Sequence, residues 1–212
     1  MIYMSPLSGD LMRLNHPLLG CMRTPANDRL LPAGMPWAAD CGLSVAVSAD
    51  PAAVDRYLGW LEKRRADLPS CLFAVAPDVL GDAAACWERS RPLLPRIRAL
   101  GYPVAFVAQD GFDPSMIDPD AFDVLFVGGK PEADKRQEWK RSETGGWAAI
   151  RWAHSVGKPV HVGRVNGEAY LRNLAHAGVR SADGTQLTWL SMVPRTLRWL
   201  DRLNGQTMME AV

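Results

Sequence analysis

Short apolar runs recur along the chain, and each ends in a polar or glycine-containing turn. In order, the runs are Ile2–Met4, Leu18–Met22, Trp37–Ala39, Leu72–Ala76, Val104–Ala108, Val124–Val127, Val160–Val162 and Val179–Ala182. Apolar runs this short, bounded by turn residues, are typical of buried strands. The pattern therefore predicts a series of buried β-strands.

Helices are expected between most of these runs. The clearest is Pro51–Arg65, because Asp50 can cap it, Pro51 suits its first turn, and Val54 and Leu61 lie on one apolar face. The others are Ala83–Leu100, Thr144–Val156, Gly167–Ala177 and Pro194–Leu203. Strands that alternate with helices pair in parallel, because the long crossover lets neighbours run the same way. We expect a compact (β/α)8 TIM-like barrel over residues 1–212, one domain in all.

An open doubly wound sheet is the alternative arrangement. The sequence has no G-x-G-x-x-G or P-loop motif, so nothing in it indicates a Rossmann or nucleoside-triphosphate site. The barrel is therefore preferred.

Composition is that of a globular protein, with 48% hydrophobic and 22% charged residues and a formal net charge of +1. A nucleic-acid partner thus has to be argued from local sequence. No apolar run approaches the roughly 20 residues of a membrane span. The four cysteines form no C-x-x-C pair and no zinc-ligand cluster with histidine. We expect reduced cysteines, no metal site, no membrane contact and a cytoplasmic location.

The ends of the predicted strands are unusually polar. They read Asp40-Cys41-Gly42, Pro77-Asp78, Gln109-Asp110-Gly111, Gly128-Gly129, His161-Val162-Gly163-Arg164 and Asp183-Gly184-Thr185. In a parallel barrel the carboxyl ends of the strands carry the functional side chains. Three carboxylates and an amide, those of Asp40, Asp78, Asp183 and Gln109, are therefore expected around one mouth.

The order of these motifs, over residues 40–185, resembles the tRNA-guanine transglycosylase (queuine tRNA-ribosyltransferase) superfamily, and above all its short DNA-modifying branch of phages and bacterial gene clusters. The resemblance implies that Asp183 is the nucleophile, that Asp40 is the general acid and base, and that Asp78 and Gln109 read the guanine edge. It also implies a backbone N–H of Gly128-Gly129 on the base carbonyl, and Val162 and Gly163 beneath the base.

The resemblance implies exchange of guanine for a free 7-deazaguanine, such as a base of the preQ0 type, without a cofactor. An aspartate can trap the oxocarbenium-like sugar covalently while a second carboxyl moves protons. The zinc-binding Cys-x-Cys-x-x-Cys motif of that family is absent. We therefore expect no zinc-binding subdomain, and DNA is favoured over tRNA as the polymer.

Basic residues and a tryptophan follow the sixth apolar run and are candidates for nucleic-acid contact. They are Lys135, Arg136, Trp139, Lys140 and Arg141. Lysine and arginine neutralise phosphates, and tryptophan can stack on an extruded base. A solvated, self-paired surface is the alternative, because Glu132, Asp134 and Glu138 lie in the same segment. Arg164 is a candidate phosphate or substrate contact, with a salt bridge as its alternative.

Simpler interpretations exist for the other candidates. An aspartate after a strand is often a helix cap, which suits Asp82 and Asp110 and is the alternative for Asp78. Asp183 before Gly184 is also a common turn pair, and His161 can be a hydrogen-bonded core residue.

Three other functions stay open at this point. They are an N-glycosidase that releases a base from nucleoside or nucleic acid, a non-catalytic nucleic-acid-binding barrel subunit, and a metabolic barrel with a phosphate site. A homodimer or a partner subunit also stays open.

Overall fold

Eight parallel strands close into one barrel in the computed structural model, which describes residues 1–6, 8–14, 16–42 and 50–210. The strands are β1 Ile2–Pro6, β2 Leu19–Arg23, β3 Trp37–Ala39, β4 Cys71–Val75, β5 Val104–Ala108, β6 Val124–Val127, β7 Val160–Val162 and β8 Ser181–Asp183. They pair in chain order, and β8 closes the ring on β1 with Met4 beside Asp183. The predicted (β/α)8 barrel is confirmed.

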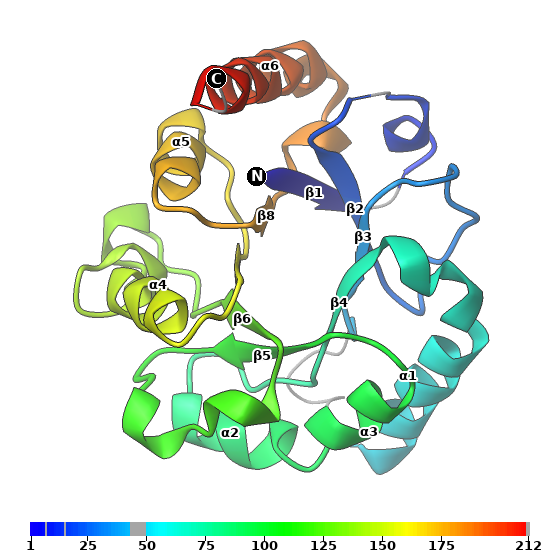
Figure 1. Cartoon of the computed structure of the whole chain (residues 1–212), viewed down its shortest axis with the longest axis vertical. Helices are drawn as coiled ribbons and strands as arrows, with labels where there is room; N and C mark the ends of the chain where they lie inside the picture. Colours follow the sequence, from blue (N-terminus) through cyan, green and yellow to red (C-terminus); the bar gives the residue numbers. More distant parts are fainter. Residues whose placement is uncertain (7, 15, 43–49, 211–212) are drawn as a thin grey trace.

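Helices surround the strands, as Figure 1 shows in a view into the barrel. They are α1 Pro51–Lys63, α2 Ala83–Ser90, α3 Leu94–Ala99, α4 Gly146–Ser155, α5 Glu168–His176 and α6 Val193–Glu210. Asp50 caps α1 as expected, accepting a hydrogen bond from the N–H of Ala52. Apolar faces of these helices cover the outside of the barrel and complete the core.

The helix layer departs from the prediction over Ala83–Leu100. The single helix expected over Ala83–Leu100 is two helices, because Pro92 and Pro95 interrupt the backbone hydrogen bonds between them. The described parts of the β1–β2 and β2–β3 connections contain only a 3₁₀ turn, Leu11–Arg13, and no α-helix. Pro17, Pro25 and Pro32 in these segments disfavour helix.

Side chains alternate between the barrel interior and the helix layer along every strand. His161 on β7 contacts the rings of Phe73 and Phe126, with ring centroids 4.9 and 4.5 Å away. These three rings fill the barrel interior beneath the carboxyl ends of the strands. Within the described residues, no helix is both long and apolar enough to cross a membrane.

Candidate active site

A pocket of about 210 Å³ opens at the carboxyl ends of the strands. Its lining includes residues from β3, β4, β5, β6, β7 and β8 or the turns directly after them: Asp40, Val75, Asp78, Leu80, Val107, Gln109, Phe126, Gly128, Gly129, Gly163, Arg164 and Asp183. The fold thus brings together the three carboxylates and the amide that the sequence placed at strand ends. Larger hollows lie elsewhere on the molecule, but this pocket is the one that holds the acidic residues of the mouth.

Two donors hold the carboxylate of Asp183. Nε2 of His161 lies 3.0 Å from its Oδ1, and the backbone N–H of Arg164 donates to its Oδ2 at 3.2 Å. The side chain is 20% exposed, so it still faces the pocket. Each carboxylate oxygen has a second lone pair, which leaves Asp183 able to bond to a substrate. It is an oriented, accessible carboxylate.

His161 connects Asp183 to the interior of the barrel. Its Nδ1 lies 2.8 Å from Oγ of Ser181, and the ring is fully buried. An ionised Asp183 can only accept, so we assign the proton to Nε2; Nδ1 then accepts from the Ser181 hydroxyl. His161 is therefore more than the core histidine considered from the sequence, because it supports the candidate nucleophile.

The other two carboxylates have surroundings that favour the protonated form. Burial raises the pKa of Asp40 above its ordinary value, and the negative charge of Asp183 raises it further. Burial likewise raises the pKa of Asp78, to which the charge of Asp40 adds. The side-chain amide of Gln109 donates to Asp78, with Nε2 2.5 Å from Oδ2. The mouth can therefore hold a proton close to Asp183.

Gln109 braces the mouth. Its Oε1 accepts the backbone N–H of Gly81 and of Gly129, each at 3.0 Å, while its Nε2 donates to Asp78. The N–H of Gly128 donates to the carbonyl of Ala108 at 2.9 Å. The expectation that a glycine N–H of this turn meets a base carbonyl is therefore wrong, because both N–H groups already have partners. Asp78 is left as the side chain placed to read a base.

Val162 does not line the pocket, contrary to expectation. Side chains alternate along β7, so His161 and Gly163 face the barrel interior and Val162 is buried against the helix layer. At Gly163 a side chain has no room, since a Cβ there would lie 2.7 Å from the ring of Phe126 and 3.3 Å from Oδ1 of Asp183. The glycine lets Asp183 and the ring approach each other.

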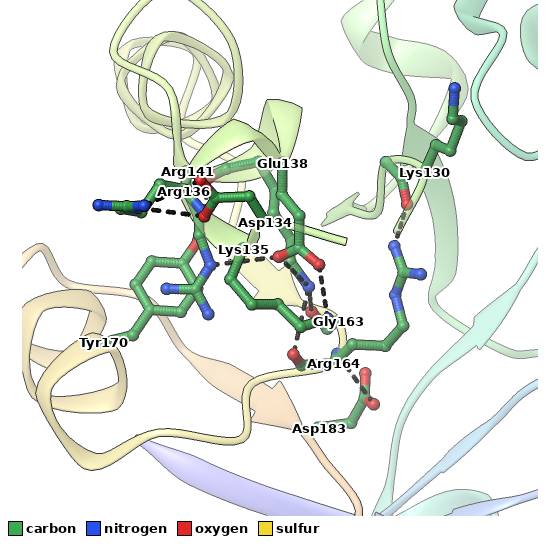
Figure 2. Close-up of polar contacts among 12 residues, drawn as sticks. Lys130, Asp134, Lys135, Arg136, Glu138, Arg141, Gly163, Arg164, Tyr170 and Asp183 are labelled. Carbon is green, nitrogen blue, oxygen red and sulfur yellow. Dashed lines mark hydrogen bonds and ion pairs between the residues drawn. The ribbon is translucent and has the colours of Figure 1, made fainter. Parts of the chain in front are cut away.

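Arg164 adopts a left-handed backbone, with φ of 57°, which is uncommon for a residue other than glycine. Its guanidinium donates to the carbonyl of Gly129, and its own N–H points at Asp183. Figure 2 shows the contact between Arg164 and Asp183. Such strain often marks a functional site. Arg164 lines the pocket, and its guanidinium ties the turn after β7 to the turn after β6.

The basic segment after β6 is largely paired with its own acids. Lys135 and Arg141 donate to Glu138 at 3.0 and 3.2 Å, and Arg136 donates to Asp134 at 3.0 Å (Figure 2). The Arg141 guanidinium also lies 4.1 Å from the ring centroid of Tyr170. The self-paired alternative describes this segment better than an open phosphate-binding loop does.

For two residues of this segment, the predicted contact with nucleic acid is wrong, because their side chains face the protein interior. Lys140 is buried, with 1% of its side chain exposed, so it cannot contact a nucleic acid. Trp139 is half-buried and packs over Gly129, where a Cβ would lie 3.1 Å from its ring. Both face inward because the chain forms two 3₁₀ turns here, Lys135–Gln137 and Trp139–Arg141. Among the described tryptophans, Trp189, 66% exposed, is the one at the surface.

The three aspartates that were considered as helix caps differ in their contacts. Asp82 caps α2 by accepting from the N–H of Ala85 at 2.9 Å, and Asp110 accepts from the N–H of Lys130 at 2.7 Å. Asp78 lies in the pocket and caps no helix.

The support of Asp183 by His161 and Ser181 is what sequence reasoning missed. Its signal was present, because Ser181 and Asp183 share one face of β8 and Ser181 pairs with His161 in register. No group of three or more His, Cys, Asp or Glu residues suited to a metal ion occurs in the part of the chain that the structure describes.

Comparison with known proteins informs only the fold. No family model matches the chain, and no curated protein matches it. A mutant tryptophan synthase α-subunit from Pyrococcus furiosus is similar over 82% of this chain and 68% of its own, with 12% identity and a TM-score of 0.54. Another mutant of that subunit gives 13% identity, 72% of this chain and a TM-score of 0.49; the chain spans 57% of its length.

A PaMucR phosphodiesterase in complex with c-di-GMP is similar over 70% of this chain and 59% of its own, with 14% identity and a TM-score of 0.45. The likeness with a TM-score of 0.54 shows a shared barrel, and at 12% identity it says nothing of the chemistry.

Proposed function

We propose that the protein is a nucleobase transglycosylase that exchanges guanine in DNA for a 7-deazaguanine through a covalent aspartyl-glycosyl intermediate. The observation that carries the proposal is one pocket holding an oriented carboxylate, Asp183, beside a carboxyl whose pKa is raised, Asp40. Displacement at a sugar carbon through a covalent intermediate needs this pair of tasks. The resemblance of the strand-end motifs to tRNA-guanine transglycosylases supplies the reaction class.

In the first half-reaction, a carboxylate oxygen of Asp183 bonds to C1′ of the sugar as the bond from C1′ to the guanine nitrogen breaks. The electron pair of that bond goes to the base, and the carboxyl of Asp40 donates a proton to it, so guanine leaves neutral. Asp40 is then a carboxylate.

In the second half-reaction, the incoming base gives its ring N–H proton to Asp40. Its nitrogen then bonds to C1′ and releases Asp183. One base replaces another, and both aspartates return to their starting states, so no further reactant is needed.

Dimensions and polarity of the pocket agree with a single base. Its volume of about 210 Å³ is below the roughly 300–1,000 Å³ of clefts that take drug-sized ligands. Guanine presents a ring N–H and an amino group next to each other, and the side chain of Asp78 in its ionised form can accept from both. Phe126 and Val107 supply apolar walls. A base has to leave the duplex to enter, as in other enzymes that act on bases.

The test is an incorporation assay. Purified protein is incubated with guanine-containing single-stranded and duplex DNA and a radiolabelled guanine or preQ0-type base, and label is counted in acid-insoluble polymer. We expect incorporation by the wild type and none by Asp183→Asn, which keeps the shape of the side chain but lacks the nucleophile.

Three other outcomes are decisive. Free guanine released without incorporation would replace the proposal with an N-glycosidase. DNA binding without either reaction would replace it with a non-catalytic subunit. A covalent adduct trapped on Asp40 instead of Asp183 would exchange the two assigned roles.

A further inference from the structure

We infer that the buried ammonium of Lys140 positions Asp183 by polarising the peptide unit between Gly163 and Arg164. Nζ of Lys140 donates to the carbonyl oxygen of Gly163 at 2.8 Å, and the N–H of Arg164 donates to Oδ2 of Asp183 at 3.2 Å. These two groups belong to the same planar peptide, in which the C=O and N–H point to opposite sides. A positive charge thus stands at one end of the peptide dipole and a negative charge at the other.

Two hydrogen bonds and one ion pair hold the ammonium. Besides the carbonyl of Gly163 it contacts the carbonyl of Arg164 at 3.2 Å and Oε2 of Glu138 at 3.7 Å. Its own backbone carbonyl accepts from the hydroxyl of Tyr170 at 3.0 Å. In Figure 2, Gly163 and Arg164 lie between Glu138 and Asp183. Lys140 therefore fixes the left-handed backbone of Arg164 in the orientation that directs the N–H of Arg164 toward Asp183.

Burial gives this arrangement its strength. A peptide N–H whose own carbonyl binds a cation is a polarised, stronger hydrogen-bond donor, and the effect is larger away from water. Lys140 and Glu138 are 1% and 2% exposed, whereas Lys135, which also pairs with Glu138, is 66% exposed. Lys140 is thus a positioning residue, and it takes no part in contact with substrate.

The charge on Lys140 changes within a pH range in which activity can be measured. Burial lowers its pKa to about 8, the neighbouring charges of Arg164 and Arg141 lower it too, and those of Glu138 and Asp183 oppose the shift. The ammonium is charged at neutral pH, and we expect its hold on the peptide to weaken as pH rises through about 8.

The first experiment does not depend on any activity. The pKa of Lys140 is measured by ¹⁵N NMR of the lysine side chains in the wild type, in Asp183→Asn and in Asp110→Asn. We expect a value of about 8 in the wild type, a lower value in Asp183→Asn and the wild-type value in Asp110→Asn. Equal values in the two variants would overturn the inference, because Lys140 and Asp183 would then not be coupled.

The second experiment, which rests on the proposed function, compares Lys140→Met with its matched control Lys158→Met, because Lys158 also donates to a backbone carbonyl, that of Phe122 at 3.0 Å, but precedes β7 at the amino ends of the strands. Lys140→Met should lower kcat by roughly 10 to 100-fold with KM within about twofold, as expected for loss of a group that orients a reacting one. Lys158→Met should leave both constants within about twofold, because the active site lies at the opposite, carboxyl ends of the strands. The fall in wild-type kcat above pH about 8 should be absent in Lys140→Met.

A kcat of Lys140→Met equal to that of Lys158→Met, with both variants folded by circular dichroism, would overturn the inference. If the wild type has no base-exchange activity, the proposed function fails while the NMR titration still decides the coupling. Should Lys140→Met not fold, the Asp183→Asn titration keeps the test intact, because that variant retains Lys140.

Discussion

Asp40 and Asp183 line the same pocket, yet the protein surrounds them differently. Asp183 accepts from His161 and from the N–H of Arg164, while Asp40 accepts from the N–H of Gly42 at 2.9 Å and has its pKa raised by burial. Paired carboxylates in unlike surroundings can divide the tasks of nucleophile and proton carrier. The different surroundings of these two aspartates therefore determine the roles that we propose for them.

Asp40→Asn should abolish base exchange and stabilise the fold near neutral pH. The folded-state pKa of Asp40 is raised, so the folded protein bears a cost when this group ionises at higher pH. The cost is absent below the ordinary value of 3.8, where folded and unfolded chains are both protonated, and it grows as pH rises through the folded pKa. Asparagine never ionises. We expect a gain on the order of 1 kcal/mol at pH 7, measured by urea unfolding.

The pH dependence separates this explanation from a packing effect. The gain should shrink as pH falls toward 3.8 and vanish below it. A gain of equal size at pH 7 and at acidic pH would contradict the raised pKa, because better packing does not titrate.

The sequence identified the right residue types at the mouth but could not assign their partners. Asp40, Asp78 and Asp183 converge because they follow strands, which a pattern can show. Gln109 was expected to contact a base, and it braces Asp78 and two glycine N–H groups, a role set by turns from three strands. Lys140 looked like a surface cation because its burial depends on the 3₁₀ turns around it.

At the scale of elements, strands were predicted better than their connections. Each apolar run became a strand, because buried parallel strands need continuous apolar sequence. The segments before β2 and β3 could not be resolved by the same argument, since the proline-rich chain there makes no periodic pattern. Period-two alternation along β7 and β8 is the signal that places His161 under Asp183.

His161→Leu should lower kcat by roughly 10 to 100-fold and leave KM nearly unchanged, because it removes the donor that orients Asp183. His161→Gln, whose amide can donate to the same carboxylate, should retain more activity. Ser181 contacts His161 and reaches Asp183 only through it, so Ser181→Ala should show a smaller loss than His161→Leu. Steady-state kinetics of base incorporation measures all three, and equal activity in His161→Leu and the wild type would remove His161 from the site.

The β4–α2 connection contains two aspartates with different tasks, Asp78 in the pocket and Asp82 at the start of α2. Asp82→Ala removes a helix cap, so it should cost about 1 kcal/mol of stability and leave activity intact. Asp78→Ala should abolish base exchange. Thermal unfolding and the incorporation assay together check the pair, and the reverse pattern would mean that Asp78 is the structural residue.

On the scale of the whole molecule, charge is nearly balanced, with 24 basic and 23 acidic residues. A polyanion must therefore be bound by local groups near the mouth. Exposed ion pairs are worth little, so a phosphate can replace the partner of an exposed cation. Lys135 and Arg136, with 66% and 90% of their side chains exposed, meet that condition, and Lys140 does not.

Replacing both Lys135 and Arg136 with alanine should weaken DNA binding and flatten its salt dependence. Each phosphate contact contributes about 0.9 to the slope of log K against log salt on duplex DNA, so the slope should fall by about 2. Fluorescence anisotropy with a labelled duplex over a salt series measures it.

Lys140→Met is the matched control, because it removes a cation from the same segment that is buried and cannot release a counterion. Its slope should equal that of the wild type. If the double variant keeps the wild-type slope as well, phosphates are bound by another face of the barrel. If instead Lys140→Met alone flattens the slope, the segment must open when DNA binds, since only an exposed ammonium can meet a phosphate.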